Sequence, residues 1–301
     1  MGAGAMGSLY GGLLASSGEE VWLVDIWKDH IEAIQSKGLA LEEKGQEKNI
    51  RIPATTDAAS VGKADLILVF VKTYHTEKAV SDSLALEKEN TIFLTLQNGL
   101  GNEEVLCRQV SPRKVLLGVT NHGATLLGPG KIRHAGWGKT FIGELDHQQT
   151  DRVSRIAQVF QKAGIETEVS MNIQGLIWEK FLVNIGINAL AAVTGLKNGQ
   201  LLDYPETLML MEAMVSEAVE VAKRKGIPVG GNPIEKVKAV AEATRTNRCS
   251  MGQDLDNKRR TEIDAINGAL VREAERLGMA VPYNWMITSL VKVIERTFLQ
   301  N

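Results

Sequence analysis

The sequence predicts an α/β protein in which a doubly wound sheet is followed by an all-helical domain. The first half alternates short apolar runs with helical segments, as parallel strands joined by crossover helices do. The second half has long amphipathic stretches and few β-branched runs. The 301 residues are enough for about two domains, and we place the boundary near residue 170, giving domains over residues 1–170 and 171–301.

Four apolar runs in the first half, each followed by a polar residue or a glycine, are expected to be strands buried on both faces. They are Val21–Val24, Leu66–Val71, Ile92–Leu96 and Val115–Val119. Between Gly118 and Glu144, short segments separated by glycines suggest antiparallel strands that complete the same sheet. A helix over Asp151–Gly164 and a last strand over Ile165–Val169 should end the domain.

Composition argues against several classes of protein. The formal net charge is -2, from 34 basic and 36 acidic side chains, so no nucleic-acid surface is expected. Uninterrupted apolar stretches are too short for a membrane span, and a leader peptide is not evident, so we expect a cytoplasmic protein. Two cysteines and five isolated histidines give no metal-ligand spacing, and no metal site is expected.

A glycine-rich turn opens the chain: Gly2-Ala3-Gly4-Ala5-Met6-Gly7 precedes an apolar helical stretch. Such glycines allow a tight turn, close approach of the backbone to a pyrophosphate and tight helix packing. A strand then ends in Asp25, 18 residues after Gly7, where a carboxylate can hold a ribose hydroxyl. This context favours Rossmann-type dinucleotide binding by Gly2, Gly4, Ala5, Met6, Gly7 and Asp25.

The strand that normally precedes this turn is absent from the sequence, because only Met1 stands before Gly2. Its loss should leave unpaired backbone groups in the middle of the sheet. Either the sequence is shortened relative to the natural chain, or something else fills the gap.

Two further strands end in polar residues, Lys72 and Gln97-Asn98-Gly99. Ligands of open α/β sheets bind beyond the carboxyl ends of the strands, so these residues and the glycine turn should share one rim.

Lys180, Asn184 and Asn188 interrupt the otherwise apolar helix expected over Leu176–Thr194. At a spacing of four residues they form a stripe about 12 Å long on one helix face. Asparagine is a poor helix former, and buried polar groups need partners. The stripe therefore predicts one wall of a polar cleft rather than a solvated face.

A second polar series consists of Ser250, Asp254, Lys258 and Glu262, again at intervals of four. The series would line one face if the helix were continuous. A solvated helix face has the same spacing, so the spacing alone does not distinguish a catalytic role for Glu262 from a position on the surface.

Taken together, these segments resemble the ketopantoate reductase family over nearly the whole chain. The matching signatures are the glycine turn, Val71-Lys72-Thr73, Gln97-Asn98-Gly99, Trp178-Glu179-Lys180 with Asn184 and Asn188, and Ser250-Met251 through Thr261-Glu262-Ile263-Asp264 to Asn267-Gly268. The resemblance implies reduction of ketopantoate to pantoate, in pantothenate and coenzyme A biosynthesis.

The resemblance also implies roles for individual residues. Lys180 would protonate the ketone oxygen as hydride arrives, and Glu262 would orient the reacting hydroxyl. Lys72 and Asn98 would lie near the cofactor and the reacting centre. Substrate binding would fall to Asn98, Asn184, Asn188, Asn198, Asn247 and Ser250.

The cofactor is where the chain departs from the family pattern. Members commonly use NADPH and have an arginine after the second strand, whereas Asp25-Ile26 stands here. A carboxylate repels the 2′-phosphate, so the local chemistry favours NADH, although Lys28 or His30 could compensate.

Three functions stay open in order of preference: ketopantoate reductase, NAD-dependent dehydrogenase of D-2-hydroxy acids, and a sensor that binds dinucleotide without turnover. The Lys180 stripe argues against the sensor. The apolar stretch Leu208–Met214 would suit a homodimer.

Overall fold

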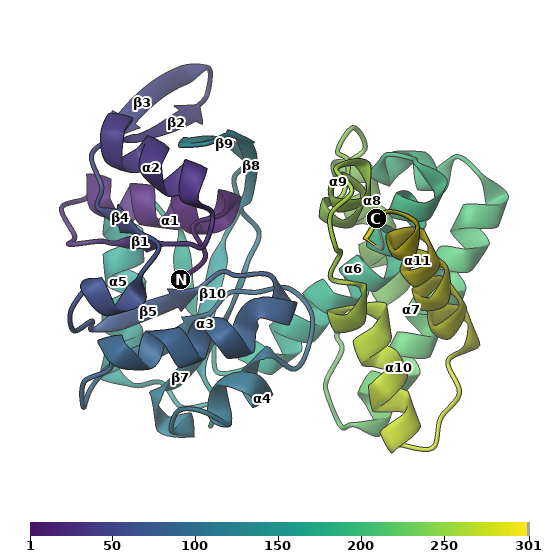
Figure 1. Cartoon of the computed structure of the whole chain (residues 1–301). Coiled ribbons are helices and arrows are strands. Elements are labelled where there is room, and N and C mark those ends of the chain that lie inside the picture. The colour runs from purple at the N-terminus through teal and green to yellow at the C-terminus, as the bar shows by residue number, and fades with distance from the viewer. Residues whose placement is uncertain (300–301) are drawn as a thin grey trace. The chain divides into compact units, whose positions relative to one another are not determined.

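The glycine turn lies at the centre of the first of two units in the computed structural model, which describes residues 1–299. The units comprise residues 1–97 with 102–173, and residues 98–101 with 174–301. The first carries all the sheets and the second is helical, which confirms the predicted fold class (Figure 1).

The main sheet of the first unit has the strand order β11-β10-β7-β6-β5. Strands β5, β6 and β7 run parallel, while β10 pairs antiparallel with β7 and parallel with β11. A separate pair, β1 and β4, is also parallel. The bounds are β1 Leu23–Val24, β4 Ala54–Thr55, β5 Leu66–Val69, β6 Ile92–Thr95, β7 Val115–Thr120, β10 Thr140–Glu144 and β11 Thr167–Val169.

Met1 and Gly2 fill part of the position between β5 and β1 where the preceding strand was expected. The Met1 nitrogen donates to the Leu68 carbonyl over 2.9 Å, and the Met1 carbonyl accepts from the Phe70 N–H over 2.9 Å. On the other side, the Gly2 N–H donates to the Val24 carbonyl over 2.8 Å. These two residues therefore satisfy backbone groups on both neighbouring strands.

A second sheet, with the order β3-β2-β9-β8, corrects one prediction. Of the segments between Gly118 and Glu144, only β10 joins the main sheet. The strands β8 (Gly123–Gly128) and β9 (Lys131–Gly136) pair instead with β2 (Leu39–Glu43), which forms a hairpin with β3 (Gln46–Ile50) that was not predicted (Figure 1).

Helix α1 (Ala5–Ser16) lies between two hydrophobic cores of the first unit. Tyr10 and Leu14 pack in the core beneath the main sheet, whereas Leu9 packs in the core that includes the second sheet. Burial on both sides explains why this helix is apolar nearly all round. The other helices of the unit are α2 Lys28–Lys37, α3 Thr76–Ser83, α4 Asn102–Cys107 and α5 Asp151–Lys162.

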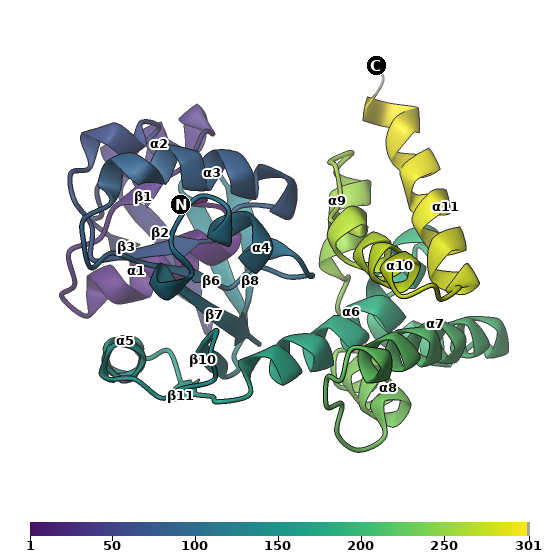
Figure 2. The same ribbon diagram turned by 90° about the horizontal axis from the view of Figure 1, so that it is seen from below.

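The second unit is built around α6 (Ile173–Thr194), whose apolar residues form its core together with residues of the later helices. The remaining helices are α7 Pro205–Arg224, α8 Pro233–Ala243, α9 Ser250–Asp256, α10 Asn267–Arg276 and α11 Pro282–Leu299, with 3₁₀ helices η5 Asn198–Leu202 and η6 Ile263–Ala265. In Figure 2, α8, α10 and α11 surround α7. Within residues 1–299, α6 alone has the length and hydropathy of a membrane span, and 61% of that window is buried.

Candidate active site

The glycine turn is shaped by close backbone contacts. Gly2 has a φ of +88°, and a Cβ there would lie 2.5 Å from the Val71 nitrogen. A Cβ on Gly7 would lie 1.9 Å from the Gly2 carbonyl oxygen, so both positions require glycine. Gly4, by contrast, faces open space and caps α1 without a side-chain hydrogen bond. Gly4 thus leaves room at the helix start.

This helix start fits a pyrophosphate. The first turn of α1, which holds Ala5 and Met6, contains no acidic side chain, and no side chain of the turn occupies the capping position. The helix dipole and the unpaired N–H groups of a helix start favour an anion. The open side of Gly4 gives that anion access.

Asp25 and Lys72 follow the ends of β1 and the β5 segment in the same unit. Asp25 Oδ1 accepts the Trp27 N–H over 3.0 Å, which folds the carboxylate back beside the following residues. Ile26 is 76% exposed and Lys28 is also exposed. The Lys72 carbonyl accepts the His75 N–H over 2.8 Å. Gln97, which follows β6, links that strand end to the β5 segment, because its amide donates to the Val71 carbonyl over 2.7 Å.

In the second unit, Lys180, Asn184 and Asn188 lie on α6 as predicted. Their neighbours in the sequence, among them Trp178 and Phe181, are buried in the core. Lys180 and Asn184 are half-buried and Asn188 is 7% exposed. A polar stripe on a helix otherwise packed in a core needs hydrogen-bond partners.

Burial lowers the pKa of Lys180 from its ordinary value of 10.5 to about 8, and the nearby Glu262 carboxylate opposes this shift. Glu262 is itself only 8% exposed. A lysine amine with a pKa near neutrality can both carry and release a proton at physiological pH, which an exposed lysine does poorly.

Glu262 reaches this position by a different route from the one expected. Helix α9 ends at Asp256, and Lys258 takes a φ of +53° at the following turn. The series from Ser250 to Glu262 is therefore not one helix face, and the exposed Lys258 lies apart from it. Glu262 instead precedes η6, where its carbonyl accepts the Ala265 N–H over 2.9 Å.

The Asn98 loop is bound to that same turn. Gly99 has a φ of +81°, and a Cβ on it would lie 2.4 Å from the Ala265 carbonyl oxygen. The Leu100 N–H donates to that oxygen over 3.0 Å. Residues 98–101 therefore belong to the second unit, and the loop carrying Asn98 is fixed beside the turn carrying Glu262.

Asn198 and Asn247 are also brought together. The Asn198 N–H donates to the Asn247 carbonyl over 3.0 Å, and its side-chain amide donates to Thr244 Oγ1 over 2.9 Å. Because Thr244 Oγ1 gives its own hydrogen to the Val240 carbonyl, it can only accept from Asn198. This arrangement fixes the orientation of the Asn198 amide.

Two buried amide atoms of these predicted residues have no hydrogen-bond partner in the described chain. They are the donor Asn184 Nδ2 and the acceptor Asn198 Oδ1. An unpaired buried polar atom costs about 1–3 kcal/mol and calls for an explanation. A ligand acceptor would satisfy Asn184 Nδ2, and a ligand donor such as a hydroxyl would satisfy Asn198 Oδ1.

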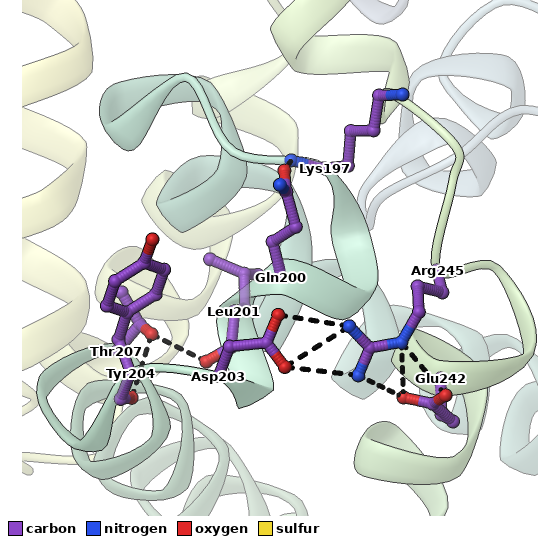
Figure 3. A network of polar contacts seen from close by, with 8 residues as sticks. All are labelled: Lys197, Gln200, Leu201, Asp203, Tyr204, Thr207, Glu242 and Arg245. Carbon is purple, nitrogen blue, oxygen red and sulfur yellow. Dashed lines mark hydrogen bonds and ion pairs between the residues drawn. The ribbon is translucent and has the colours of Figure 1, made fainter.

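A charged clamp holds the segment that carries Asn198 (Figure 3). The Arg245 guanidinium bonds Asp203 at the end of η5 and Glu242 at the end of α8, over 2.7–3.2 Å. The Arg245 carbonyl also accepts the Gly199 N–H, and a Cβ on Gly199 would lie 2.5 Å from the Arg245 side chain. Sequence reasoning missed this clamp because surface charges have no characteristic spacing.

Ser250 and Asn247 are exposed. The connector between them is anchored to α6, because Cys249 Sγ donates to the Asn188 carbonyl over 3.3 Å and Arg248 donates to the Ala191 carbonyl. The sequence placed these residues by resemblance alone, and the anchoring shows how the connector and α6 are joined.

Two of the histidines, which are isolated in the sequence, form a linked pair in the structure. His134 Nδ1 meets Glu43 Oε1 and its Nε2 meets His122 Nδ1, each over 3.0 Å. His122 Nε2 has no partner within the described residues, and burial lowers the pKa of His122. No group of residues in the described range 1–299 could hold a metal ion.

Comparison with known proteins finds matches along the whole chain. Residues 1–147 match the family model "Ketopantoate reductase PanE/ApbA", and residues 172–295 match its C-terminal counterpart. A 2-dehydropantoate 2-reductase of Halobacterium salinarum is 38% identical over 98% of this chain and 97% of its own length. One from Pyrococcus horikoshii is 38% identical over 98% and 96%.

Solved structures are also similar to this chain over nearly its whole length. A PanE/ApbA family ketopantoate reductase from Ralstonia eutropha is 33% identical with a TM-score of 0.93, covering 100% of this chain and 98% of its own. A ternary structure of D-mandelate dehydrogenase with NADH and anilino(oxo)acetate is 31% identical with a TM-score of 0.93, covering 99% and 97%.

Proposed function

Because the chain belongs to the ketopantoate reductase family, we propose that it reduces the ketone of 2-dehydropantoate to pantoate. The observations that carry this proposal are the unpaired donor of Asn184, the unpaired acceptor of Asn198, and a lysine on the same helix face as Asn184 whose pKa burial lowers to about 8. The substrate has a carboxylate that accepts hydrogen bonds, a hydroxyl that donates one, and a ketone that needs a proton.

The cofactor, when bound, supplies a hydride to the carbonyl carbon. Side chains of the protein would protonate the ketone oxygen and orient the hydroxyl that it becomes. Lys180 gives a proton to that oxygen as negative charge develops on it, and then regains one from solvent. Glu262 keeps the amine protonated and orients the new hydroxyl, because its carboxylate favours the charged form of Lys180.

The amides would position the substrate. Asn184 donates to the carboxylate, and Asn198 accepts from the distal hydroxyl. Asn98, Asn188, Asn247 and Ser250 complete the substrate contacts that the family resemblance implies. A site built around a hydroxyl discriminates strongly against analogues that lack it.

For the cofactor, the proposed contacts are Gly2, Gly4, Ala5, Met6 and Gly7 at the pyrophosphate, Asp25 at the ribose and Lys72 nearer the nicotinamide. The family resemblance implies NADPH. We propose NADH for this chain, because Asp25 and the exposed Ile26 stand where a 2′-phosphate would need a cation.

A second candidate is an NAD-dependent dehydrogenase of D-2-hydroxy acids. Asp25 and the similarity to D-mandelate dehydrogenase, which was solved with NADH, favour it. Its aromatic 2-oxo acid substrates have no distal hydroxyl, so they would leave Asn198 Oδ1 unpaired. A non-catalytic dinucleotide sensor remains third, since it has no use for the Lys180 and Glu262 pair.

One assay separates the three functions. Absorbance at the reduced nicotinamide band is followed with 2-dehydropantoate, its counterpart without the hydroxyl, and phenylglyoxylate, with NADH and NADPH in turn. The proposal expects the highest kcat/KM with 2-dehydropantoate. Preference for phenylglyoxylate would establish the second candidate, and no oxidation with any acid would leave the sensor.

We also propose a cytoplasmic homodimer. Both cysteines are free, as in a reducing compartment. Of the stretch Leu208–Met214, only Met209 is strongly exposed, but α11 exposes Met286, Leu290 and Val293 at helical spacing. A second copy that covers this stripe would bury apolar surface. Sedimentation of the protein and of a Leu290→Glu variant tests the dimer.

A further inference from the structure

Trp27 presents an aromatic ring in the segment just after Asp25. Its indole lies nearly parallel to the His30 imidazole, with the ring centroids 5.1 Å apart and the planes at 9°. His30 is fully buried, whereas Trp27 is 37% exposed. One face of the indole is therefore backed by a buried ring, and part of the side chain remains open to solvent.

The ring behind Trp27 is held on both nitrogens. The Gly130 N–H donates to His30 Nδ1 over 3.0 Å, so in the neutral imidazole the hydrogen resides on Nε2. That nitrogen is 3.2 Å from Ser8 Oγ, which in turn donates to the Ala3 carbonyl over 2.7 Å. Trp27 is thus braced, through His30 and Ser8, against the glycine turn itself.

The position of Trp27 follows from its hydrogen bond to Asp25, the residue proposed to hold a ribose hydroxyl. The backbone N–H of Trp27 donates to Asp25 Oδ1 over 3.0 Å, which leaves the second carboxylate oxygen for a ribose hydroxyl. In a dinucleotide, the ribose that an acid at this position holds is the one that carries adenine. The adenine is attached to the ribose that Asp25 would hold, and Trp27 is two residues after Asp25 in the sequence.

We propose that Trp27 is the stacking platform for the adenine of the dinucleotide, an inference that rests on the proposed function. A flat, electron-rich indole backed by a second ring is well suited to a purine, because every base has a π-face and offset stacks are favoured. The contact would add affinity that does not depend on the 2′ position, so it serves NADH and NADPH alike.

The test compares a whole dinucleotide with a half that lacks adenine. In Trp27→Ala, the ratio of kcat/KM for NADH to kcat/KM for reduced nicotinamide mononucleotide should fall about tenfold, and Trp27→Phe should restore most of it. An equal loss with both cofactors would mean that Trp27 only supports the fold, and no loss would mean that it makes no contact. Either outcome overturns the proposal.

A binding measurement tests the same contact without any turnover of substrate. Calorimetry with ADP-ribose should show about tenfold weaker binding in Trp27→Ala than in the unchanged protein. Trp22→Ala is the matched control, because Trp22 is equally exposed at 37% and lies five residues earlier in the same unit. Equal weakening in both variants would overturn the platform. If no 2-oxo acid is reduced, ADP-ribose binding still decides this inference separately from the proposed function.

Discussion

The two units differ in how their buried polar side chains are paired. In the first, the buried Ser8 and His30 have partners within the chain. In the second, Asn184, Asn198 and Asn267 each leave a buried amide atom without a partner in the described chain. His122 is the exception in the first unit.

This difference follows from how each unit would hold its ligand. A pyrophosphate at the glycine turn is bound by backbone N–H groups at the start of a helix, so the ligand-free turn can have its side chains satisfied. A small acid held by side-chain amides leaves those amides unpaired when it is absent. Unpaired amide atoms at Asn184 and Asn198 are therefore what the proposed substrate site would leave in the ligand-free chain.

The largest expected effect is on the reacting group of the second unit. Lys180→Ala should lower kcat by about 10²–10⁴-fold, because proton donation contributes in the transition state, with little change in dinucleotide affinity. Steady-state kinetics together with cofactor titration measure both quantities. Lys225→Ala, which removes a lysine paired with Glu273 in the same unit, is the control. Equal losses in turnover and cofactor affinity would contradict the assignment.

The pH profile sharpens the same point. Because the proposed proton donor is protonated Lys180 and burial lowers its pKa to about 8, ketone reduction should fall as pH rises through about 8, approaching tenfold per unit above it. Glu262 raises the pKa of Lys180, so in Glu262→Gln the fall should begin at lower pH. A profile that stays flat to pH 10 would exclude Lys180 as the donor.

The unpaired acceptor of Asn198 gives a third test. In Asn198→Ala, the preference for 2-dehydropantoate over its counterpart without the hydroxyl should narrow about tenfold, the upper range for one hydrogen bond. The readout is the ratio of the two kcat/KM values, which a general loss of stability does not change. An unaltered ratio would show that Asn198 does not meet the hydroxyl.

A substitution in the first unit should change the preference between cofactors and leave the preference between substrates unaltered. Asp25→Ala should improve use of NADPH relative to NADH by about fivefold, since a repulsive carboxylate is removed from the 2′ position. Measuring kcat/KM with both cofactors checks it. If the unchanged protein already prefers NADPH tenfold, the placement of Asp25 at the ribose is wrong.

The smallest effect is expected at the Arg245 clamp. Arg245→Gln breaks its bonds to Asp203 and Glu242, but exposed ion pairs contribute little to stability. The ratio of kcat/KM for 2-dehydropantoate to kcat/KM for its counterpart without the hydroxyl should fall only about threefold, because the Asn198 amide is held less firmly. Arg133→Gln, which breaks a two-bond pair with Glu42 in the first unit, should leave that preference unaltered.

The sequence predicted regular elements far better than irregular ones. The α6 stripe could be predicted because helical spacing alone puts Lys180, Asn184 and Asn188 on one face. Glu262 could not, since Lys258 ends the helical spacing at a positive φ and the turn before η6 has no period to read. Only the family resemblance supplied that residue.

The missed β2–β3 hairpin did carry a readable signal. Lys44 and Gly45 both have positive φ, at 50° and 77°, which is the two-residue hairpin turn that matches strand twist. The Lys-Gly pair between Leu39–Glu43 and Gln46–Ile50 could have indicated it. Nothing local, however, shows that β8 and β9 pair with this hairpin, because strand partners far apart in sequence are chosen by the fold as a whole.

The tetrapeptide 98–101 has a consequence for how the chain can be divided. The backbone passes between the units three times, at residues 97/98, 101/102 and 173/174, and Gly99 must sit against Ala265 of the later segment. If the chain is cut once near residue 173, this loop and Asn98 remain on the first fragment, whereas the turn that the loop contacts is on the second. Exchanging halves between relatives would carry the same penalty, so the two units should be inherited and engineered as one piece.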